Sequence, residues 1–399
     1  MQKDIVPVLL GADINVVGMS RAFYDEYGVK SIAIGKYDSG PCKDSKIIDY
    51  RVQPNIEDET VYLSLINKIA NDNKDALVFV LGCGDHYLEL ISKCKSFYAE
   101  NIVAPYIDYD VMKDIINKEK FYAMCEKVGV DYPDTYVHRK ELGFDFSLPF
   151  DPPYIAKPSR GIEYFAHPFE GQKKAYKLET YEELIDVLKK VYESGYDDSM
   201  IIQNFIPGDD SYMRVMTGYS TKDAKVVMTC MGHVLLEEHT PTGIGNHAVI
   251  ITEPHEETEL KLKALLEDIG YTGFSNFDMK YDERDGKYKV FELNCRQGRS
   301  NYYVTASNEN LAKLLVEDYT GGSSPEYHSA TAEFLWMVIP KKTAFKYVNK
   351  NYHDDMKRLI AEHKCVNPLW NSKDRGFKKT LRYLKSQFRY ATQFDEYMK

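Results

Sequence analysis

Residues 290–303, VFELNCRQGRSNYY, place an acid, an amide and two arginines close together after a strand-like run. Another strand-like run, TGFSNFDMKYD at residues 272–282, precedes it, and DERDG at residues 282–286 has the composition of a hairpin turn. Because side chains two positions apart on a strand share a face, we expect Glu292 and Asn294 to point the same way, beside Asp278 of the neighbouring strand. Two carboxylates and an amide oxygen are typical ligands of Mg²⁺ that also contacts substrate phosphates. The stretch therefore predicts a hairpin that holds a metal nucleotide.

The first hundred residues alternate short apolar runs with amphipathic segments, an order typical of a parallel sheet with helices on its faces. The apolar runs are IVPVLLGAD (5–13), KSIAIG (30–35) and ALVFVLGCGD (76–85). The turns at Gly11–Asp13 and Gly82–Asp85 follow two of these runs, where parallel sheets open their ligand crevice. Neither turn is a complete G-x-G-x-x-G fingerprint, so we predict no dinucleotide site.

From residue 111 the pattern changes. Residues 111–137 predict one helix that closes at Gly129, followed by an extended segment. A strand then carries Lys157, and residues 158–177 are expected to form a loop before a helix over residues 180–195. The later strands, among them residues 225–239, alternate as in an antiparallel sheet with one buried face.

Length and composition limit the classes of protein. At 399 residues the chain should form two or three domains, and 44% hydrophobic and 28% charged residues are ordinary for a globular protein. No apolar run is long enough to cross a bilayer and no secretory signal is evident, so we expect a cytoplasmic protein. The seven cysteines include no C-x-x-C pair, which favours reduced, mostly buried thiols over disulfides or structural zinc.

Charge is unevenly distributed along the chain. The net charge is −10, yet residues 341–399 hold 15 Lys and Arg against 6 Asp and Glu. This basic tail is expected to be a solvated helix packed on the body, or alternatively a patch that meets an anionic partner such as a membrane surface or a phosphorylated precursor. An acidic body without a recognition motif argues against nucleic acid.

Several elements in the same order resemble the ATP-grasp ligases. D-M-K-Y-D, a hairpin turn and F-E-L-N-C-R are similar to that superfamily's metal-binding acids, amide and following arginine. The resemblance implies that Asp278, Glu292 and Asn294 hold Mg²⁺ on ATP and that Lys118 and Lys157 contact its phosphates. It also implies that the hinge QNFIPGDD passes the adenine through Gln203, Asn204, Phe205 and Ile206, and that Asp210 binds the ribose.

The implied fold is an α/β ATP-grasp fold in four parts. These are an N-terminal parallel, Rossmann-like domain (1–112), an α+β lid (113–205), an antiparallel-sheet catalytic domain (206–335) and a basic helical tail (336–399).

A narrower resemblance is to the D-aspartate ligases of Gram-positive cell-wall cross-bridge synthesis. It rests on phrases such as LLGADINVVGMSRAF (9–23), FIPGDDSYMRV (205–215) and ELNCRQGRS (292–300). The resemblance implies that ATP activates the β-carboxyl of D-aspartate, which is then joined to the lysine amine of the peptidoglycan stem peptide. Whether the acceptor is a soluble nucleotide-linked or a lipid-linked precursor stays open, and only the resemblance indicates D rather than L stereochemistry.

The lid departs from the superfamily, because residues 158–177 contain only two glycines where a glycine-rich phosphate loop is usual. Phosphate contacts are therefore expected partly from the side chains of Arg160, Lys173 or Lys174. Gln203 and Asn204 stand where an acid and a lysine are frequent. We therefore expect adenine recognition to rest more on backbone groups.

Roles in the chemistry follow from the resemblance. Arg296 is the candidate for stabilising an acyl phosphate, and Arg299 or Arg214 for clamping the carboxylates of a dianionic acid, with structural ion pairs as the alternative for both. Asn246, in the loop-containing segment 235–250, is expected to line a substrate pocket. His239 and His247 of this loop are left without a catalytic role, since a connector with exposed histidines is an equal alternative.

Two other functions stay open. One is another ATP-grasp enzyme, of the carbamoyl-phosphate-synthase-like group, that uses a different small acid or amine. The other is a nucleotide-binding regulator without turnover, which a complete set of metal ligands and both lysines disfavours.

Overall fold

The computed structural model describes residues 4–241, 243–321 and 326–398. The chain forms two compact units. The first comprises Met1–Tyr109, Asp209–Phe277 and Asn294–Lys399, and the second comprises Asp110–Gly208 and Asp278–Leu293.

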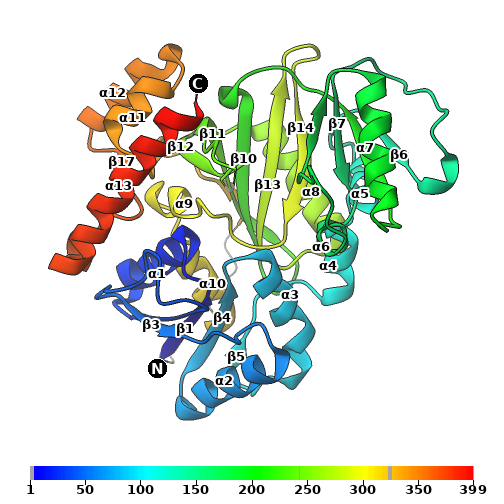
Figure 1. Ribbon diagram of the computed structural model, residues 1–399. Helices are drawn as coiled ribbons and strands as arrows, with labels where there is room; N and C mark the ends of the chain where they lie inside the picture. Colours follow the sequence, from blue (N-terminus) through cyan, green and yellow to red (C-terminus); the bar gives the residue numbers. More distant parts are fainter. Residues whose placement is uncertain (1–3, 242, 322–325, 399) are drawn as a thin grey trace. The chain divides into compact units, whose positions relative to one another are not determined.

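The first unit contains the predicted parallel sheet (Figure 1). Its strand order is β3-β2-β1-β4-β5, and every neighbouring pair is parallel. The strands are β1 (Ile5–Leu10), β2 (Ser31–Gly35), β3 (Ile48–Val52), β4 (Leu77–Gly82) and β5 (Ile102–Val103). The helices of this region are α1 (Ile14–Tyr27), α2 (Glu59–Asp72) and α3 (Asp85–Cys94), with the 3-10 turn η1 (Lys95–Phe97). β1 and β4 are the buried centre of the sheet, as their continuous apolar sequences predict.

A larger mixed sheet has the order β14-β13-β10-β11-β12-β16-β17, with β15 beside β11. Its strands are β10 (Met213–Ser220), β11 (Val226–Glu237), β12 (His247–Thr252), β13 (Gly273–Asp282), β14 (Lys287–Asn294), β15 (His328–Ser329), β16 (Leu335–Met337) and β17 (Cys365–Val366). The associated helices are η3 (Asp210–Tyr212), α8 (Glu256–Ile269), α9 (Tyr302–Ala306) and α10 (Leu311–Thr320). The division between the units crosses β13 and falls at the end of β14.

The expectation of one buried face is wrong for the central strands of this sheet. All six residues of β12 are buried, and all residues of β11 except Glu237. The run VVMTCMGHVLL lacks the alternation of a half-exposed strand, and α8 and α9 pack against β11 and β12. Both faces of these strands are therefore covered.

The second unit contains a four-stranded antiparallel sheet of order β6-β9-β7-β8. The strands are β6 (Thr135–His138), β7 (Tyr154–Pro158), β8 (Tyr176–Leu178) and β9 (Met200–Asn204). The helices are α4 (Tyr109–Ile116), which begins at the last residue of the first unit, α5 (Lys118–Val128), α6 (Gly161–Ala166) and α7 (Tyr181–Glu193), with η2 (Lys140–Leu142). Leu184, Leu188 and Tyr192 of α7 pack on this sheet with tyrosines of the strands.

Two local expectations are corrected here. The single helix predicted from residue 111 is two helices, because Asn117 leaves the helical conformation and its side chain accepts a hydrogen bond from the backbone N–H of Lys120 at the start of α5. The expected loop 158–177 contains the short helix α6. Its mixed polar and aromatic sequence, GIEYFA, does not predict a helix.

The C-terminal segment of the first unit is mostly helical. It contains α11 (Lys341–Tyr347), η4 (Lys350–Tyr352), α12 (His353–Ala361), η5 (Ser372–Asp374) and the long α13 (Phe377–Tyr397). One end of α13 is tied to the loop after β2, since Arg382 lies 2.7 Å from Asp44. The other end is tied to α11 by the ion pair of Asp395 with Lys346 at 2.7 Å. The predicted basic tail is thus part of the packed first unit.

Among the described residues, no helix combines the length and the apolar character that crossing a membrane requires.

Candidate functional site

Two lysines of the second unit lie close to one glutamate. Lys118 is the first residue of α5, and its Nζ lies 3.8 Å from Oε2 of Glu292 on β14. Lys157 lies on β7, and the charge of Glu292 also acts on it. The structure thus brings three predicted site residues together within one unit, from segments far apart in the sequence.

Tyr122 connects this group, and the sequence did not single it out. Its hydroxyl accepts a hydrogen bond from Nζ of Lys157 at 3.1 Å and donates one to the backbone oxygen of Phe291 at 2.8 Å. Its ring stacks on Tyr132, with centroids 5.0 Å apart. Tyr122 stands four residues after Lys118 on α5, and therefore on the same helix face. That spacing was the only signal for it in the sequence.

Both lysines have altered acidity. The pKa of Lys157 is lowered to about 8, chiefly by burial and also by the positive charge of Lys174, against the opposing charge of Glu292. Burial also lowers the pKa of Lys118, again against Glu292, with Lys157 and Lys174 adding to the decrease. Lys118, Lys157 and Lys174 repel one another and Glu292 partly offsets the charge of the first two, so an anion bound beside these lysines would lower the electrostatic energy of the site.

Two hinge side chains are already held within the second unit. Nε2 of Gln203 donates to Oγ1 of Thr135 at 2.8 Å, and Oδ1 of Asn204 accepts from Arg284 at 3.0 Å. These contacts occupy polar atoms that could otherwise read a base edge. They agree with the expectation that backbone groups carry adenine recognition, which stays a prediction.

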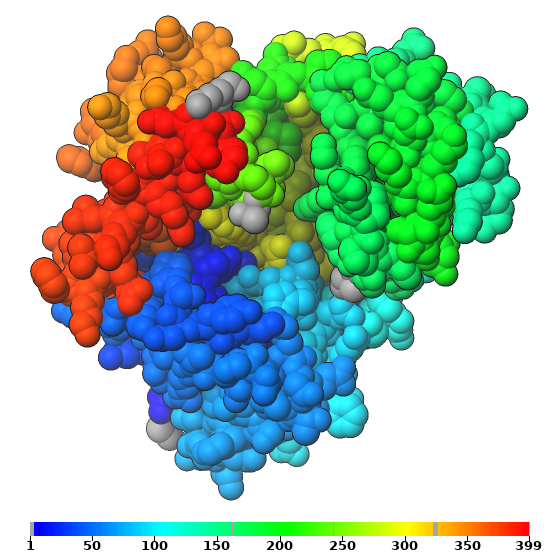
Figure 2. Space-filling view, viewed as in Figure 1, coloured from blue at the N-terminus to red at the C-terminus, as the bar shows by residue number. Residues whose placement is uncertain are grey.

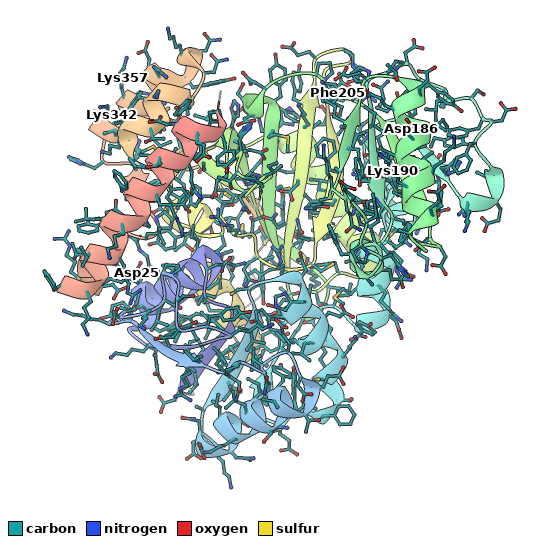
Figure 3. All side chains as sticks on the ribbon, in the orientation of Figure 1. Asp25, Asp186, Lys190, Phe205, Lys342 and Lys357 are labelled. Carbon is teal, nitrogen blue, oxygen red and sulfur yellow. The ribbon has the colours of Figure 1, made fainter. Side chains whose placement is uncertain are left out.

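The next two hinge residues are apolar. Phe205 (Figure 3) has the ammonium groups of Lys177 and Lys280 over its ring, at 4.7 and 5.5 Å from the centroid. Ile206 is buried.

Asp210, the predicted ribose acid, belongs to the first unit. Its Oδ2 accepts hydrogen bonds from the backbone N–H of Glu237 at 2.9 Å and from Nε2 of His239 at 2.8 Å. The hydrogen bond to Asp210 raises the pKa of His239. The carboxylate is therefore held in place by β11 and the loop that follows it.

The predicted metal ligands lie on the neighbouring strands β13 and β14, and the hairpin between them is confirmed. Asp278 and Glu292 are in the second unit, and Asn294 is in the first, where its Nδ2 donates to the backbone oxygen of Asn276 at 3.3 Å. The fully buried Asp282 anchors the turn through Arg284 at 2.7 Å and Lys289 at 3.0 Å.

The chemistry of this donor set fits magnesium. Asp278 and Glu292 are both partly exposed, and Glu292 already faces a cation in Lys118. Over the described part of the chain, no three His, Cys, Asp or Glu side chains gather as a metal centre. The predicted magnesium set consists of two carboxylates and one amide, so it does not count as a group of three His, Cys, Asp or Glu side chains.

Arg296 lies in the first unit at the carboxyl edge of the parallel sheet. Its Nε lies 2.6 Å from Oδ1 of Asp85, the first residue of α3 after β4. Asp13, which follows β1, is buried, and burial raises the pKa of its carboxyl group against the opposing charges of Arg299 and Arg296. β1 and β4 are paired, so the two turns predicted to flank a crevice end neighbouring strands.

Buried amides beside Arg296 were missed in the sequence. Gln297 donates to the backbone oxygen of Gly82 at 3.1 Å, and its own backbone oxygen accepts from Nδ2 of Asn15 at 3.1 Å. Asn301 donates to Oδ1 of Asn15 at 2.9 Å. This network fixes the segment after β14 to the ends of β1 and β4. Single amides in a loop gave no signal for it.

The other two predicted arginines each have acidic partners. Nη2 of Arg299 lies 2.8 Å from Oε1 of Glu238 and 3.3 Å from the hydroxyl of Tyr390. Nη2 of Arg214 lies 3.6 Å from Oε1 of Glu253, and its Nη1 donates to the backbone oxygen of Ser211 at 2.9 Å. A substrate role for either arginine stays a prediction.

The loop after β11 is more ordered than a simple connector. The backbone oxygen of Asn246 accepts from the N–H of Glu238 at 2.8 Å. His247 is buried as the first residue of β12, and burial together with the nearby Arg299 lowers its pKa to about 4. The alternative of exposed histidines is therefore wrong for His247, which is uncharged at neutral pH.

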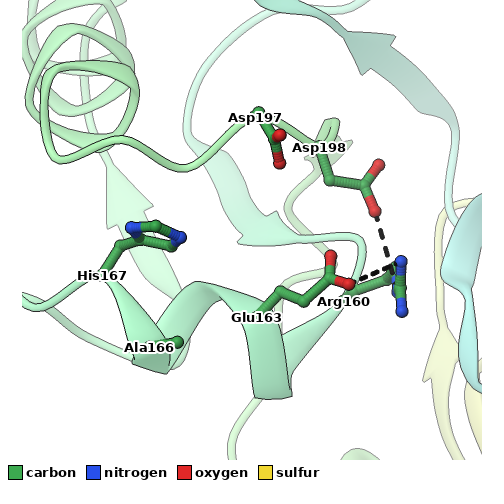
Figure 4. A pocket seen from close by; sticks show the side chains of 6 residues that line it. All are labelled: Arg160, Glu163, Ala166, His167, Asp197 and Asp198. Atoms are coloured by element: carbon green, nitrogen blue, oxygen red, sulfur yellow. Dashed lines mark ion pairs between the residues drawn. The ribbon is translucent and has the colours of Figure 1, made fainter.

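Figure 4 shows the surroundings of Arg160, one of the three cations predicted to reach phosphate. Arg160 lies 2.7 Å from Glu163 and 3.9 Å from Asp198, at the wall of a cavity of about 540 Å³. Lys174 is exposed, and its charge acts on both Lys118 and Lys157. Of these cations, Lys174 has the clearer electrostatic link to the lysine pair.

Comparison with known proteins identifies the family. The chain is 39% identical to the D-aspartate ligase of Enterococcus faecium (strain Aus0004) over 408 residues, which cover 99% of this chain and 97% of that protein. No protein-family model matches the chain.

Solved structures share the fold at low identity. The N5-carboxyaminoimidazole synthetase of Staphylococcus aureus superposes with a TM-score of 0.62 at 12% identity, covering 98% of each chain. The biotin carboxylase domain of the Hydrogenobacter thermophilus 2-oxoglutarate carboxylase, solved with MgADP, has a TM-score of 0.54 at 16% identity and covers 74% of this chain and 64% of that one. The chain has the ATP-grasp fold and belongs to the D-aspartate ligase family.

Proposed function

We propose that this protein is an ATP-dependent carboxylate–amine ligase that joins the β-carboxyl group of D-aspartate to the lysine side-chain amine of a peptidoglycan stem peptide. The observation that carries the proposal is 39% identity to a D-aspartate ligase over nearly the whole length of both chains. The grouping of Lys118, Lys157 and Glu292 supports it, because it supplies a binding place for a triphosphate.

The reaction has two steps. A β-carboxylate oxygen of D-aspartate attacks the γ-phosphorus of ATP, and the bond from that phosphorus to the β–γ bridging oxygen breaks. ADP is the leaving group, and the resulting acyl phosphate remains in the site. The neutral lysine amine then attacks the acyl carbon, the carbon–oxygen bond breaks, phosphate leaves and the amine loses its proton. Negative charge on the phosphoryl oxygens must be offset in both steps.

Most residues assigned to the nucleotide belong to the second unit, and Asp210 belongs to the first. Lys118 and Lys157 hold the ATP phosphates, with Lys174 as an added cation, and Tyr122 orients Lys157 through its hydroxyl. The backbone of Gln203–Ile206 contacts the adenine, and Asp210 contacts the ribose. ATP binding relieves the repulsion among the lysines, since it places negative charge between them.

Asp278, Glu292 and Asn294 are the side chains that hold Mg²⁺, in a hairpin that Asp282 stabilises. When bound, the ion neutralises charge on the nucleotide phosphates. The MgADP in the biotin carboxylase domain named above supports this choice of metal and nucleotide.

The remaining roles belong to the first unit. Arg296, which Asp85 and the buried amide network orient, stabilises the acyl phosphate. Arg299 or Arg214 binds the carboxylates of the acid, and Asn246 lines its pocket. We assign no base to the amine, because His247 is a weak base with its pKa lowered to about 4.

The protein acts in the cytoplasm, and α13 allows it to touch the inner face of the membrane. Phe377, Leu381, Leu384 and Phe388 recur every three or four residues on α13, so they form one stripe, and Phe377 and Phe388 are 86% and 76% exposed. Lys385 and Arg389 are exposed beside the stripe. Figure 2 shows α13 (red) at the surface. An apolar stripe with a basic flank is typical of helices that lie on anionic lipid.

Sedimentation with lipid vesicles tests this contact. We expect the protein to pellet with vesicles rich in anionic lipid and not with neutral vesicles, and we expect F377S/F388S to remain in the supernatant. Phe97→Ser provides the control, since Phe97 is 66% exposed in the first unit but lies outside α13. Equal pelleting of wild type and the α13 variant would remove the membrane contact.

Phosphate release tests the proposed reaction. Purified protein with ATP and Mg²⁺ is offered D-aspartate, L-aspartate or other small acids, with and without a lysine-containing muramyl pentapeptide. We expect release that needs both D-aspartate and the pentapeptide. Release that depends on another acid would instead favour a different ATP-grasp ligase, and no release with any acid would favour a nucleotide-binding regulator.

A further inference from the structure

A cavity of about 390 Å³ lies in the first unit between α13 and the carboxyl edge of the parallel sheet. Asp13 and the loop at Gly40–Pro41 form one side, and Arg299 and α13 form the other. Its volume lies within the range of about 300–1,000 Å³ typical of small-molecule pockets. Among the residues that line this cavity, only Arg299 has a role in the proposed binding of substrates.

The lining is rich in cations and hydroxyl groups. Five basic side chains line the cavity, against the single carboxyl group of Asp13: Arg299, Lys379, Arg382, Lys385 and Arg389. Tyr383, Ser386 and Tyr390 add hydroxyl groups from the same face of α13. Permanently charged donors together with hydroxyl groups are the chemistry that binds phosphate.

Three of these cations already have acidic partners in the protein. Arg299 lies 2.8 Å from Glu238, Arg382 lies 2.7 Å from Asp44, and Lys379 lies 3.4 Å from Asp374. These ion pairs fix the walls of the cavity.

Lys385 and Arg389 are different, because both are exposed and no ion pair or hydrogen bond joins either to the described part of the chain, although the charge of Arg389 acts on Glu238. They stand four residues apart on α13 and therefore on the same side of the helix. The charge that remains for a ligand is thus concentrated at one rim of the cavity.

The cavity is close to the residues assigned to the chemistry. Arg299, in its wall, follows Arg296 by three positions, and the charges of both arginines act on Asp13 in the opposite wall. A ligand in the cavity is therefore near the arginine assigned to the acyl phosphate. The acid substrate has only two carboxylates, and Arg299 alone could bind one of them. A larger anion is needed to reach Lys385 and Arg389 as well.

We propose that this cavity binds the phosphate-bearing part of the amine acceptor, with Lys385 and Arg389 as its phosphate-binding side chains. The inference rests on the proposed function, since it concerns the second substrate of that reaction. It places the phosphate-bearing part of the acceptor between α13 and the carboxyl edge of the parallel sheet.

Kinetics with three acceptors test the assignment. The same muramyl pentapeptide is used with a nucleotide diphosphate, with a lipid diphosphate in detergent, and without phosphate. For K385A/R389A we expect KM for the diphosphate acceptors to rise about tenfold or more, because two charge-assisted contacts are lost. KM for the phosphate-free acceptor, for ATP and for D-aspartate should not change. A rise with only one diphosphate acceptor would support the proposal and identify the source of the phosphate.

The matched control is K342A/K357A, which likewise removes two exposed positive charges from the first unit, in this case both lysines (Figure 3). This control should keep the wild-type KM for every acceptor. An unchanged KM of K385A/R389A for both diphosphate acceptors, or an equal rise with the phosphate-free acceptor, would overturn the assignment. A rise in KM for D-aspartate would place the acid in the cavity and would also overturn it.

A binding measurement keeps this inference distinct from the proposed function. Calorimetry with pyrophosphate, on protein first saturated with ADP so that Lys118 and Lys157 are occupied, should show binding to the wild type and to K342A/K357A that K385A/R389A loses. If no acceptor supports turnover with D-aspartate, the proposed function fails. The phosphate site is then tested only by the pyrophosphate affinities of the three proteins. Equal pyrophosphate affinity of all three proteins would overturn the phosphate site.

Discussion

Glu292 is the residue on which the proposed site depends most, because it serves both the predicted metal and the lysine pair. Its Oε2 lies 3.8 Å from Nζ of Lys118, and its charge opposes the lowered pKa of Lys157. Replacing it with glutamine keeps the shape and removes the charge. We expect E292Q to lose activity by about a hundredfold or more, as for removal of one transition-state electrostatic contact.

The folding of E292Q is checked by circular dichroism and thermal unfolding, which should match the wild type. Glu283→Gln makes the same chemical change at an exposed position of the β13–β14 turn and should remain active. Normal turnover of E292Q would remove Glu292 from the mechanism.

The lowered pKa of Lys157 predicts that ATP binding is coupled to proton uptake and therefore depends on pH. Since its pKa is lowered to about 8, it is charged in the free protein at pH 6.5 and mostly neutral at pH 9. Bound phosphates favour the charged form, so ATP binding should take up protons at pH 9 and few at pH 6.5. Calorimetry in buffers of different ionisation enthalpy measures this uptake. We expect a value near one proton per ATP at pH 9, about 0.9 from Lys157 alone.

Lys157→Arg isolates this contribution, because arginine stays charged at both pH values. The variant should lose most of the uptake at pH 9, and what remains reports Lys118, whose pKa is also lowered. Lys190→Arg, at an exposed position of α7 (Figure 3), should behave like the wild type. Wild-type ATP binding without proton uptake at pH 9 would contradict the role of Lys157.

At the scale of elements, the β13–β14 hairpin sets the register of Asp278 and Glu292. Gly286 closes its turn with a φ of 72°, and an added Cβ there would meet only the hydroxyl of Tyr281, at 3.9 Å. The cost of a side chain is therefore conformational rather than steric. We expect Gly286→Ala to lower the free energy of unfolding by about 1–2 kcal/mol, the cost of left-handed backbone for an ordinary residue.

Urea unfolding of wild type, Gly286→Ala and Gly286→Asn measures that cost. Asparagine tolerates left-handed backbone, so its variant should lie between the other two. If the alanine variant unfolded at the wild-type urea concentration, the turn would not require a left-handed residue.

Long, strongly patterned elements could be predicted from the sequence, and short or two-sided ones could not. β1, β2, β4 and the β13–β14 hairpin were all predicted, because apolar runs and turn residues mark them. β5 has two residues and α6 has six, which is too short for a periodic pattern. The break at Asn117 was missed because the apolar spacing continues across it, and only the capping side chain separates α4 from α5.

At the scale of the whole molecule, the sequence and the structure identify different parts of the proposed site. Lys118, Lys157 and Glu292 could be named from their motifs. Tyr122, Asn15 and Gln297, which orient neighbouring groups, could not, because a helical tyrosine or a loop amide is ordinary until distant segments meet. The cavity beside α13 likewise joins residues more than three hundred positions apart, so no local pattern announces it.

The central claim about the whole molecule is that ATP activates the β-carboxyl group of D-aspartate as an acyl phosphate. The most direct test supplies D-aspartate labelled with oxygen-18 in both β-carboxyl oxygens, together with Mg²⁺, ATP and the muramyl pentapeptide. Because the attacking carboxylate oxygen leaves with the phosphate, mass spectrometry should find one oxygen-18 in each phosphate released. Unlabelled phosphate, released at the rate of amide formation, would contradict the account.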